Sequence, residues 1–391
     1  MTKLYIGTSG WSYIDWVGIF YKSPERLLSQ YCRYFKTVEM DSSFYTIPSI
    51  EVMNGIARTI LHGFKMSLKM PRYITHESLL GKKGKFDDIL KQFYRNIEPI
   101  LRRGSAAAIL IQLPPKFGYD PVTLENFLSI LDDRYRYAVE FRETSWLKPE
   151  TYKLLEKYNV AYTIVDEPLL PPDTIVTTDI AYIRWHGRGL RPWYNYRYTD
   201  HELREWILKI ETIMDQVDYI YGYFNNHFHG YAVENALQIL DMFGLLDEKG
   251  KEELEKIKNR LDKPYIKRRM LKMDEYLIDT LDLKGILELL TDKKRLERGL
   301  RISDKELHFT RVDPDQIVAD IRDYKVIIDS QERMIIHNCG DWQRLHMEKK
   351  LCKHLVKIIV AMPREDALNI ARDLAKNIDL WSFEYLETPT T

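Results

Sequence analysis

Two of the chain's three cysteines lie beside histidines near the carboxyl end of the sequence. His337 and Cys339 are two residues apart, as are Cys352 and His354, in the stretch HNCGDWQRLHMEKKLCKHL. Residues i and i+2 of a strand point to one face, so the first pair can chelate an ion from a strand end. Two thiolates and two imidazoles fill a tetrahedral shell and leave no position for water, which favours structural Zn²⁺.

The segment before this motif must position its first pair. Residues 324–336 (YKVIIDSQERMII) predict two short β-strands around a Ser-Gln-Glu turn. The twelve residues between Cys339 and Cys352 are enough to return the chain and close the site. The alternative interpretation is that the cysteines are small buried apolar residues and the histidines lie on the surface.

The same stretch resembles the SWIM-type zinc finger, whose pattern is Cys-x-Cys, a variable gap, and Cys-x-His. Asp341, Trp342 and Lys353 match further residues common in that family, whereas His337 replaces its first cysteine. His346 or His308 can therefore be the fourth ligand instead. The resemblance covers residues 305 to 380 and implies binding of nucleic acid or protein, with Lys353 as a nucleic-acid contact.

The first 245 residues alternate short apolar runs with amphipathic segments. The segments between the runs carry apolar residues at helical spacing and often begin with Asp, Ser or Thr. Eight β/α units in about 240 residues predict a TIM (β/α)₈ barrel. A doubly wound open sheet is the alternative, although GTSGWS lacks the G-x-G-x-x-G spacing. The eight runs begin at Leu4, Thr37, Phe64, Ala107, Tyr137, Ala161, Ile180 and Tyr219.

Every predicted strand ends in polar or ionisable residues, and barrel enzymes act at the carboxyl ends of their strands. The candidate catalytic residues at these ends are Glu39, Lys69, Glu140, Asp166 and His186. The candidate substrate-binding residues are Ser9, Trp11, Tyr13, Asp41, Tyr45, Gln112, Arg142, Arg184, Arg188, Trp193, Asn225 and Asn226.

These groups allow several chemistries. Glu39 and Glu140 can hold one Mg²⁺ or Mn²⁺, with His186 as general base or further ligand. Alternatively, a desolvated Lys69 can form a Schiff base with an aldehyde such as an open abasic sugar, assisted by Glu140 or Asp166. A third interpretation is a closed ion-pair network of Lys69, Glu39 and Glu140.

Arg142, Arg184 and Arg188 suit phosphate better than acid–base work. Aromatic residues interleave with arginine in RGLRPWYNYRY from Arg188, a pattern that suits stacked bases and paired phosphates. The same aromatic residues also suit sugar rings.

Seven blocks closely resemble the signature blocks of the YecE-like barrel family, a numbered domain of unknown function. They are GTSGWSYIDWVGIFY, EMDSSFYTIP, KMSLKMPRYITHE, QLPPKF, AVEFRETSW, RWHGRG and YFNNHFHGYAVENA. The resemblance runs in order from residue 4 to about 240 and implies a TIM barrel. It implies no activity, and the family's likeness to endonuclease IV is one of fold.

A basic segment follows the barrel region. Residues 263–272 (KPYIKRRMLK) contain five basic residues and no acid. The candidate nucleic-acid contacts here are Lys267, Arg268, Arg269 and Lys272. Residues 273–300 then predict two short amphipathic helices joined near Gly285. The expected organisation is a barrel (1–245), a basic helical connector (246–304) and a small zinc-binding α+β module with a C-terminal helix (305–391).

Composition limits where and with what the protein acts. The formal net charge of the 391 residues is zero, so any nucleic-acid surface must be a local patch. No apolar run approaches the roughly 20 residues of a membrane span. The sequence opens directly into a predicted strand without a signal peptide. We expect a cytoplasmic protein with no membrane partner.

Together these features predict a nucleic-acid-binding protein, a DNA repair or processing enzyme of the nuclease, glycosylase or abasic-site lyase type. DNA is the expected partner, with repair proteins as further candidates. The alternatives are a non-catalytic adaptor that binds nucleic acid or protein, and a carbohydrate-active barrel.

Overall fold

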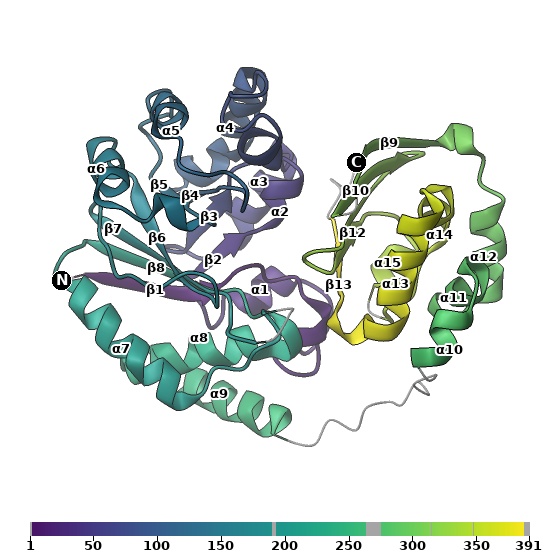
Figure 1. The fold of residues 1–391 in the computed structure, drawn as a ribbon. Coiled ribbons are helices and arrows are strands. Elements are labelled where there is room, and N and C mark those ends of the chain that lie inside the picture. The colour runs from purple at the N-terminus through teal and green to yellow at the C-terminus, as the bar shows by residue number, and fades with distance from the viewer. Residues whose placement is uncertain (1, 190–192, 263–274, 314, 347, 387–391) are drawn as a thin grey trace. The chain divides into compact units, whose positions relative to one another are not determined.

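The computed structural model describes residues 2–189, 193–262, 275–313, 315–346 and 348–386. The chain divides into two compact units (Figure 1). The amino-terminal unit comprises Met1–Trp11 and Gly18–Arg260, and the carboxyl-terminal unit comprises Ser12–Val17 and Leu261–Thr390. Each unit has its own sheet.

Eight parallel strands form the sheet of the amino-terminal unit, as predicted for a TIM barrel. β1 and β2 close it through a parallel bridge between Ser9 and Glu39, and the Gly10 amide donates to the Glu39 carbonyl over 2.8 Å. A Cβ on Gly7 would lie 2.4 Å from the Thr37 carbonyl oxygen, so this approach requires glycine. The strands are β1 (Lys3–Thr8), β2 (Thr37–Met40), β3 (Lys65–Lys69), β4 (Ala106–Gln112), β5 (Tyr137–Glu140), β6 (Ala161–Asp166), β7 (Ile180–Trp185) and β8 (Tyr219–Phe224).

Most of these strands are buried along their length, because helices cover the barrel and side chains fill it. The β6–β7 crossover carries no helix, and its Pro171 and Pro172 account for the extended chain there. The remaining helices are α1 (Leu27–Tyr31), α2 (Ser42–Tyr45), α3 (Ile50–Thr59), α4 (Asp87–Arg102), α5 (Pro121–Leu128), α6 (Pro149–Lys157), α7 (Asp200–Met214), α8 (Tyr231–Met242) and α9 (Glu248–Leu261).

A five-stranded sheet forms the second unit, in the order β13-β12-β11-β10-β9. β11 and β12 pair antiparallel around residues 330–333, which agrees with the predicted hairpin, whereas β13 joins β12 in parallel. The strands are β9 (Leu307–Val312), β10 (Gln316–Ile321), β11 (Tyr324–Asp329), β12 (Met334–His337) and β13 (Ser382–Tyr385).

Helices cover this sheet, and Trp342 and Trp381 lie fully buried in the core between them. Residues 275–300 form three helices where two were predicted. Gly285 is not a joint, because Asp282 caps a helix by accepting the Gly285 amide over 2.8 Å. The helices are α10 (Glu275–Thr280), α11 (Leu283–Leu290), α12 (Lys293–Leu300), α13 (Trp342–Leu345), α14 (Lys353–Ala361) and α15 (Arg364–Asn377).

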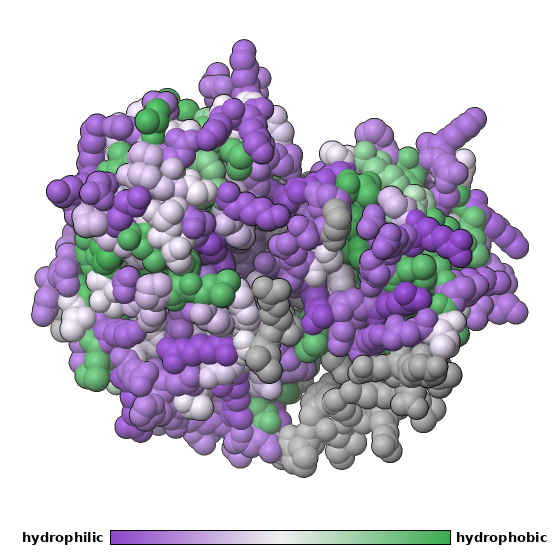
Figure 2. Space-filling model, viewed as in Figure 1, coloured by the Kyte–Doolittle hydropathy of each residue, from purple (hydrophilic) through white to green (hydrophobic). Residues whose placement is uncertain are grey.

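Hydrophobic residues on the visible surface form scattered patches between hydrophilic ones (Figure 2). Within the described residues, none of the helices combines the length and the apolar character needed to cross a membrane.

Candidate metal centre and barrel mouth

His337, Cys339, Cys352 and His354 converge in the carboxyl-terminal unit. All four are buried, and one potential ligand atom from each lies within 4.8 Å of the others. Among the described residues, no other group of three or more His, Cys, Asp or Glu side chains brings its potential ligand atoms together in this way. The end of β12 supplies the first pair, and the start of α14 supplies the second.

The backbone fixes the orientation of His337. Its Nδ1 lies 2.7 Å from the Lys325 carbonyl on the neighbouring strand, so Nδ1–H donates and Nε2 keeps its lone pair. That Nε2 is 3.4 Å from Nδ1 of His354. Zinc–nitrogen bonds of about 2.0–2.1 Å at a tetrahedral angle separate two nitrogens by about 3.3–3.4 Å. The imidazole pair therefore has the spacing that a tetrahedral ion requires.

The two sulfurs shift each other's pKa in opposite directions. A hydrogen bond from the Cys352 thiol lowers the pKa of Cys339 to about 2. Burial, followed by the neighbouring Cys339 sulfur, raises the pKa of Cys352. The lowered pKa of Cys339 favours the thiolate, the form that binds a metal.

The alternative fourth ligands lie elsewhere. His346 Nδ1 is bonded to the Trp342 carbonyl over 2.5 Å, and His308 is exposed on β9. Trp342 packs on Phe383 and donates its indole N–H to the Glu384 carbonyl over 2.7 Å, so it supports the fold beside the cluster. The half-buried Lys353 separates the candidate ligands Cys352 and His354.

The carboxyl ends of the barrel strands bring most of the predicted mouth residues together around Arg184. The Arg184 guanidinium, 1% exposed, donates to Glu39 on β2 and to Glu140 on β5, each over 2.7 Å. The Tyr182 hydroxyl also donates to Glu39, over 2.6 Å. Sequence reasoning missed Tyr182, although it shares a strand face with Arg184.

A second guanidinium extends this network. Arg142 Nε lies 2.5 Å from Glu140 Oε1, and its Nη1 donates to Glu167 over 2.6 Å. Burial alone would raise the pKa of Glu140, but Arg142 and Arg184 together lower it well below its usual value. Glu140 is therefore ionised, and both Glu39 and Glu140 pair with arginine.

His186 lies inside this network and is neutral. Arg142 Nη2 is 3.2 Å from Nε2, and the Asn225 amide is 3.0 Å from Nδ1. Burial, with the charges of Arg142 and Arg184, lowers the pKa of His186 to about 3. A histidine with so low a pKa is a poor general base near neutral pH, which argues against the predicted general-base role of His186.

The predicted Mg²⁺ or Mn²⁺ site does not fit this arrangement. A divalent cation bound by Glu39 and Glu140 would have to displace the Arg184 guanidinium that already pairs with both. The predicted binding of phosphate by Arg142 and Arg184 does not fit either, because both guanidiniums already pair with carboxylates. Arg188 is occupied too, by both oxygens of Asp166 over 2.8 and 2.9 Å.

Lys69 lies at the more open side of the mouth. Its Nζ is 3.1 Å from Asp41 Oδ1 and 4.7 Å from the centre of the Phe44 ring. The Ser9 hydroxyl contacts both Asp41 and Glu39 and joins this pair to the Arg184 network. The side chain of Asp41 is 19% exposed, so this corner reaches solvent. Burial raises the pKa of Asp41, but Lys69 and Arg184 outweigh it and lower that pKa.

Asp166 pairs with residues outside the Arg184 network, which argues against its predicted catalytic role. Besides Arg188, it accepts the Trp206 indole N–H from α7 over 2.6 Å, so it faces the helix layer. Asn226 is also structural, because its amide donates to the Tyr196 carbonyl and to Asn235, each over 2.8 Å.

The other predicted residues have diverse places. Gln112 Oε1 lies 3.5 Å from Arg184 at the mouth. Trp193 is half-buried beside Gly187, and Tyr45 packs against Phe44. The Trp11 carbonyl accepts from Tyr21 over 2.5 Å, and the Tyr13 ring lies 4.9 Å from that of Trp16. Lys267, Arg268, Arg269 and Lys272 lie outside the described residues.

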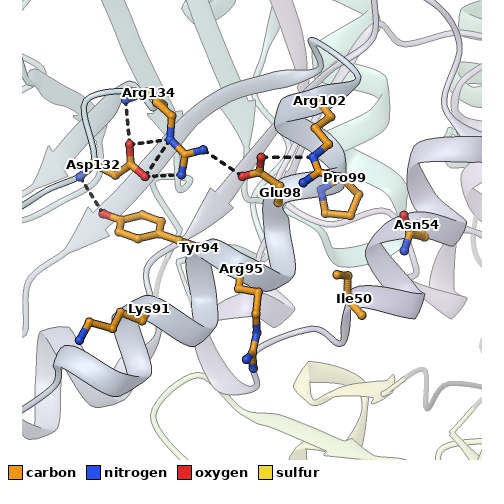
Figure 3. A pocket seen from close by; sticks show the side chains of 10 residues that line it. All are labelled: Ile50, Asn54, Lys91, Tyr94, Arg95, Glu98, Pro99, Arg102, Asp132 and Arg134. Atoms are coloured by element: carbon orange, nitrogen blue, oxygen red, sulfur yellow. Dashed lines mark hydrogen bonds and ion pairs between the residues drawn. The ribbon is translucent and has the colours of Figure 1, made fainter.

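A surface groove of about 550 Å³ lies on the outside of the barrel, between α3 and α4 (Figure 3). Its charged side chains largely satisfy one another: Arg134 pairs with Asp132 and Glu98, and Glu98 also pairs with Arg102. No predicted site residue lines it.

Comparison with known proteins agrees with this fold. The family model described as "Protein of unknown function DUF72" matches residues 5–259. The chain is 24% identical to UPF0759 protein YunF of Bacillus subtilis, over 62% of the chain and 95% of YunF. It is 30% identical to UPF0759 protein YecE of Escherichia coli, over 36% of the chain and 48% of YecE.

Solved structures of two DUF72 family proteins are also similar. The one from Thermotoga maritima is 32% identical, with a TM-score of 0.57, over 62% of this chain and 99% of its own. The one from Enterococcus faecalis shares the fold at 22% identity, with a TM-score of 0.54, over 63% of this chain and 99% of its own. The chain therefore belongs to the DUF72 family, also designated UPF0759.

Proposed function

We propose that this chain is a nucleic-acid-binding protein whose carboxyl-terminal unit is a SWIM-type module folded around structural zinc. The observation that carries the proposal is the buried convergence of His337, Cys339, Cys352 and His354. The two sulfurs and two imidazoles would hold the ion and leave no position for substrate, so the metal supplies folding energy and not chemistry. Imidazole at position 337 replaces the thiolate of the SWIM pattern without changing the number of ligands.

For the barrel, we propose processing of DNA by abasic-site lyase chemistry at Lys69. Of the three predicted reaction types, this one needs neither a free carboxylate pair nor a metal. The Lys69 amine is anchored 3.1 Å from Asp41, at the corner of the mouth that reaches solvent. Asp41 replaces Glu140 and Asp166 as the assisting carboxylate, because Glu140 is held by two arginines and Asp166 faces α7.

The proposed reaction begins when the Lys69 ammonium passes a proton to Asp41. The amine adds to the aldehyde carbon of the open abasic sugar, and loss of water gives an imine. Removal of a proton from the adjacent carbon then expels the 3′ phosphate, and water hydrolyses the imine to release the amine. Asp41 is close enough to Lys69 to accept and return these protons.

One observation favours a second candidate function, a non-catalytic adaptor. Arg142, Arg184 and Lys69 each pair with carboxylates of the barrel, so the mouth carries no uncompensated cation among these residues. A rigid ion-pair network of this kind can have a purely structural role, which is to stabilise the barrel. The adaptor would bind nucleic acid through its zinc module and transform nothing.

The test incubates the full-length protein with labelled single-stranded, duplex, abasic and deaminated oligonucleotides, in separate reactions with no addition, with EDTA, with Mg²⁺ and with Mn²⁺. Borohydride is added to reduce any imine to a stable adduct. We expect binding to nucleic acid and an EDTA-resistant adduct with abasic DNA. Lys69→Met abolishes the adduct and leaves binding intact, whereas Lys65→Met, at the other end of the same strand, retains it.

The outcomes separate the candidates. Binding without any product across the panel supports the adaptor. Cutting that requires added Mg²⁺ or Mn²⁺ would contradict the lyase chemistry and assign hydrolysis to the barrel. Absence of binding to every oligonucleotide would refute nucleic-acid binding itself.

A further inference from the structure

Helix α12 presents a row of exposed cations on the surface of the carboxyl-terminal unit. The segment from Asp292 to Arg301 (DKKRLERGLR) carries five basic and two acidic residues, a net charge of +3. Arg295 pairs with Asp292 and Asp341. Four exposed cations, hereafter the α12 cations, have no ion-pair partner among the described residues: Lys293, Lys294, Arg298 and Arg301.

Helical geometry places the α12 cations on one face. At about 100° per residue, they fall within an arc of about 140°, interrupted only by Glu297. The opposite face carries Leu296 and Gly299, which are buried against the unit's core. The cation row rises about 12 Å from Lys293 to Arg301, more than two helical turns.

The other side of α12 is locked to the segment that carries two metal ligands. A Cβ on Gly299 would lie 2.6 Å from Val356 and 2.8 Å from the Lys353 carbonyl oxygen, so the helices meet at backbone distance. Just before α12, the Thr291 hydroxyl donates to the Leu351 carbonyl over 2.6 Å, and the Leu351 amide donates to Leu290 over 2.9 Å. The orientation of α12 thus depends on the fold of residues 351–356, which include Cys352 and His354.

We propose that the α12 cations form the surface that binds the phosphate backbone of nucleic acid. This inference rests on the proposed function and identifies the part of the chain that performs the binding. The partner follows from charge: a polyanion with regularly spaced phosphates complements a row of cations along a helix, and the whole chain, with zero net charge, offers no general attraction. The contact reads the backbone and carries no base specificity.

Counterion release gives the expected magnitude. Each phosphate neutralised contributes about −0.7 to the slope of log K against log salt for single strands and about −0.9 for duplex. Four contacts therefore account for a slope of about −3, equivalent to a loss of affinity of roughly fifty-fold or more between 50 and 200 mM salt. A variant without the α12 cations loses this part of the salt dependence.

The experiment measures the affinity of the full-length, zinc-loaded protein for a labelled 20-nucleotide single strand and its duplex across 50–200 mM KCl. The test variant is Lys293→Gln/Lys294→Gln/Arg298→Gln/Arg301→Gln. The matched control removes four exposed barrel cations by Lys36→Gln/Lys91→Gln/Arg95→Gln/Lys153→Gln. Both variants lose the same charge, and thermal unfolding checks that both remain folded.

We expect the α12 variant to bind more weakly, with a slope reduced by about 3, and the barrel variant to match the wild type. If the wild type binds but the α12 variant has the same affinity and slope, this inference is overturned while nucleic-acid binding stands. If the wild type binds no oligonucleotide, both proposals fail. Parallel arms with anionic lipid vesicles and polyglutamate test the other polyanions, and binding to either without oligonucleotide binding would overturn the assignment to nucleic acid.

Discussion

Arg184 is the residue whose loss should damage the barrel most. Its guanidinium is fully buried between Glu39 and Glu140. In an Arg184→Met variant, Glu140 keeps its contact with Arg142, but Glu39 is left with the hydroxyls of Tyr182 and Ser9. Removing one partner of a buried ion pair costs about 3–5 kcal/mol, because the other charge stays buried and uncompensated. That cost is a large share of the roughly 5–15 kcal/mol that stabilises a typical domain.

The assay must report on the barrel alone. Hydrogen–deuterium exchange of peptides from β5 and β7 in increasing urea measures the free energy of global opening of that unit. The control is Arg134→Met, which removes a half-exposed arginine paired with Asp132 and should cost about 0–1 kcal/mol. Adding Glu39→Gln to Arg184→Met removes the orphaned charge and should restore about 2 kcal/mol.

The pH dependence gives an independent check. The pKa of Glu140 is lowered in the folded wild type, so its ionised form stabilises the fold above the unfolded pKa near 4.5, and this stabilisation is lost as pH falls. Without Arg184, the pKa of Glu140 is lowered less, so the variant's disadvantage should shrink as pH falls from 7 to 5. If Arg184→Met costs no more than Arg134→Met at pH 7, the reasoning about the network is refuted.

Two further predictions concern other positions. The pKa of His186, lowered to about 3 by burial and by two guanidiniums, predicts that its NMR ring signals stay constant from pH 5 to 8; titration near pH 6.5 would contradict the network. Its folded pKa lies below the unfolded value, so it makes stability fall as pH drops from about 6.5 towards 3. Gly299→Ala should lower the unfolding free energy of the carboxyl-terminal unit by about 1–3 kcal/mol, because its Cβ would clash with Val356 and the Lys353 carbonyl. A lower urea midpoint of that unit would report this loss. The matched control is Gly55→Ala, at a glycine of helix α3 whose Cβ would meet no atom within 4 Å, and an equal loss in both variants would contradict the clash.

The eight barrel strands could be predicted because a parallel strand buried on both faces is a short apolar run, and such runs recurred at regular intervals. The convergence of His337, Cys339, Cys352 and His354 could be predicted because the spacing within each pair is local. Gly285 misled the helix assignment, since glycine also occurs in a first helical turn when a cap such as Asp282 accepts its amide.

The pairing of side chains across the barrel mouth could not be predicted from the sequence. Asp166 ends its strand as Glu39 and Glu140 end theirs, yet it faces α7, because the side-chain alternation of a strand decides its direction. Which arginine neutralises which carboxylate depends on distances across the barrel. The sequence could predict that charges meet there, but not that Arg184 lies between the two candidate metal ligands.

The proposed zinc site is the claim on which the nucleic-acid function depends, and metal content tests it directly. Elemental analysis with native mass spectrometry of the full-length protein should give one zinc per chain. Cys339→Ser and Cys352→Ser should lose the zinc and the fold of the carboxyl-terminal unit, whereas Cys32→Ser, which alters the buried cysteine of the barrel, should retain both. Zinc-free wild-type protein with a folded carboxyl-terminal unit, or zinc that persists in both Cys339→Ser and Cys352→Ser, would contradict the account.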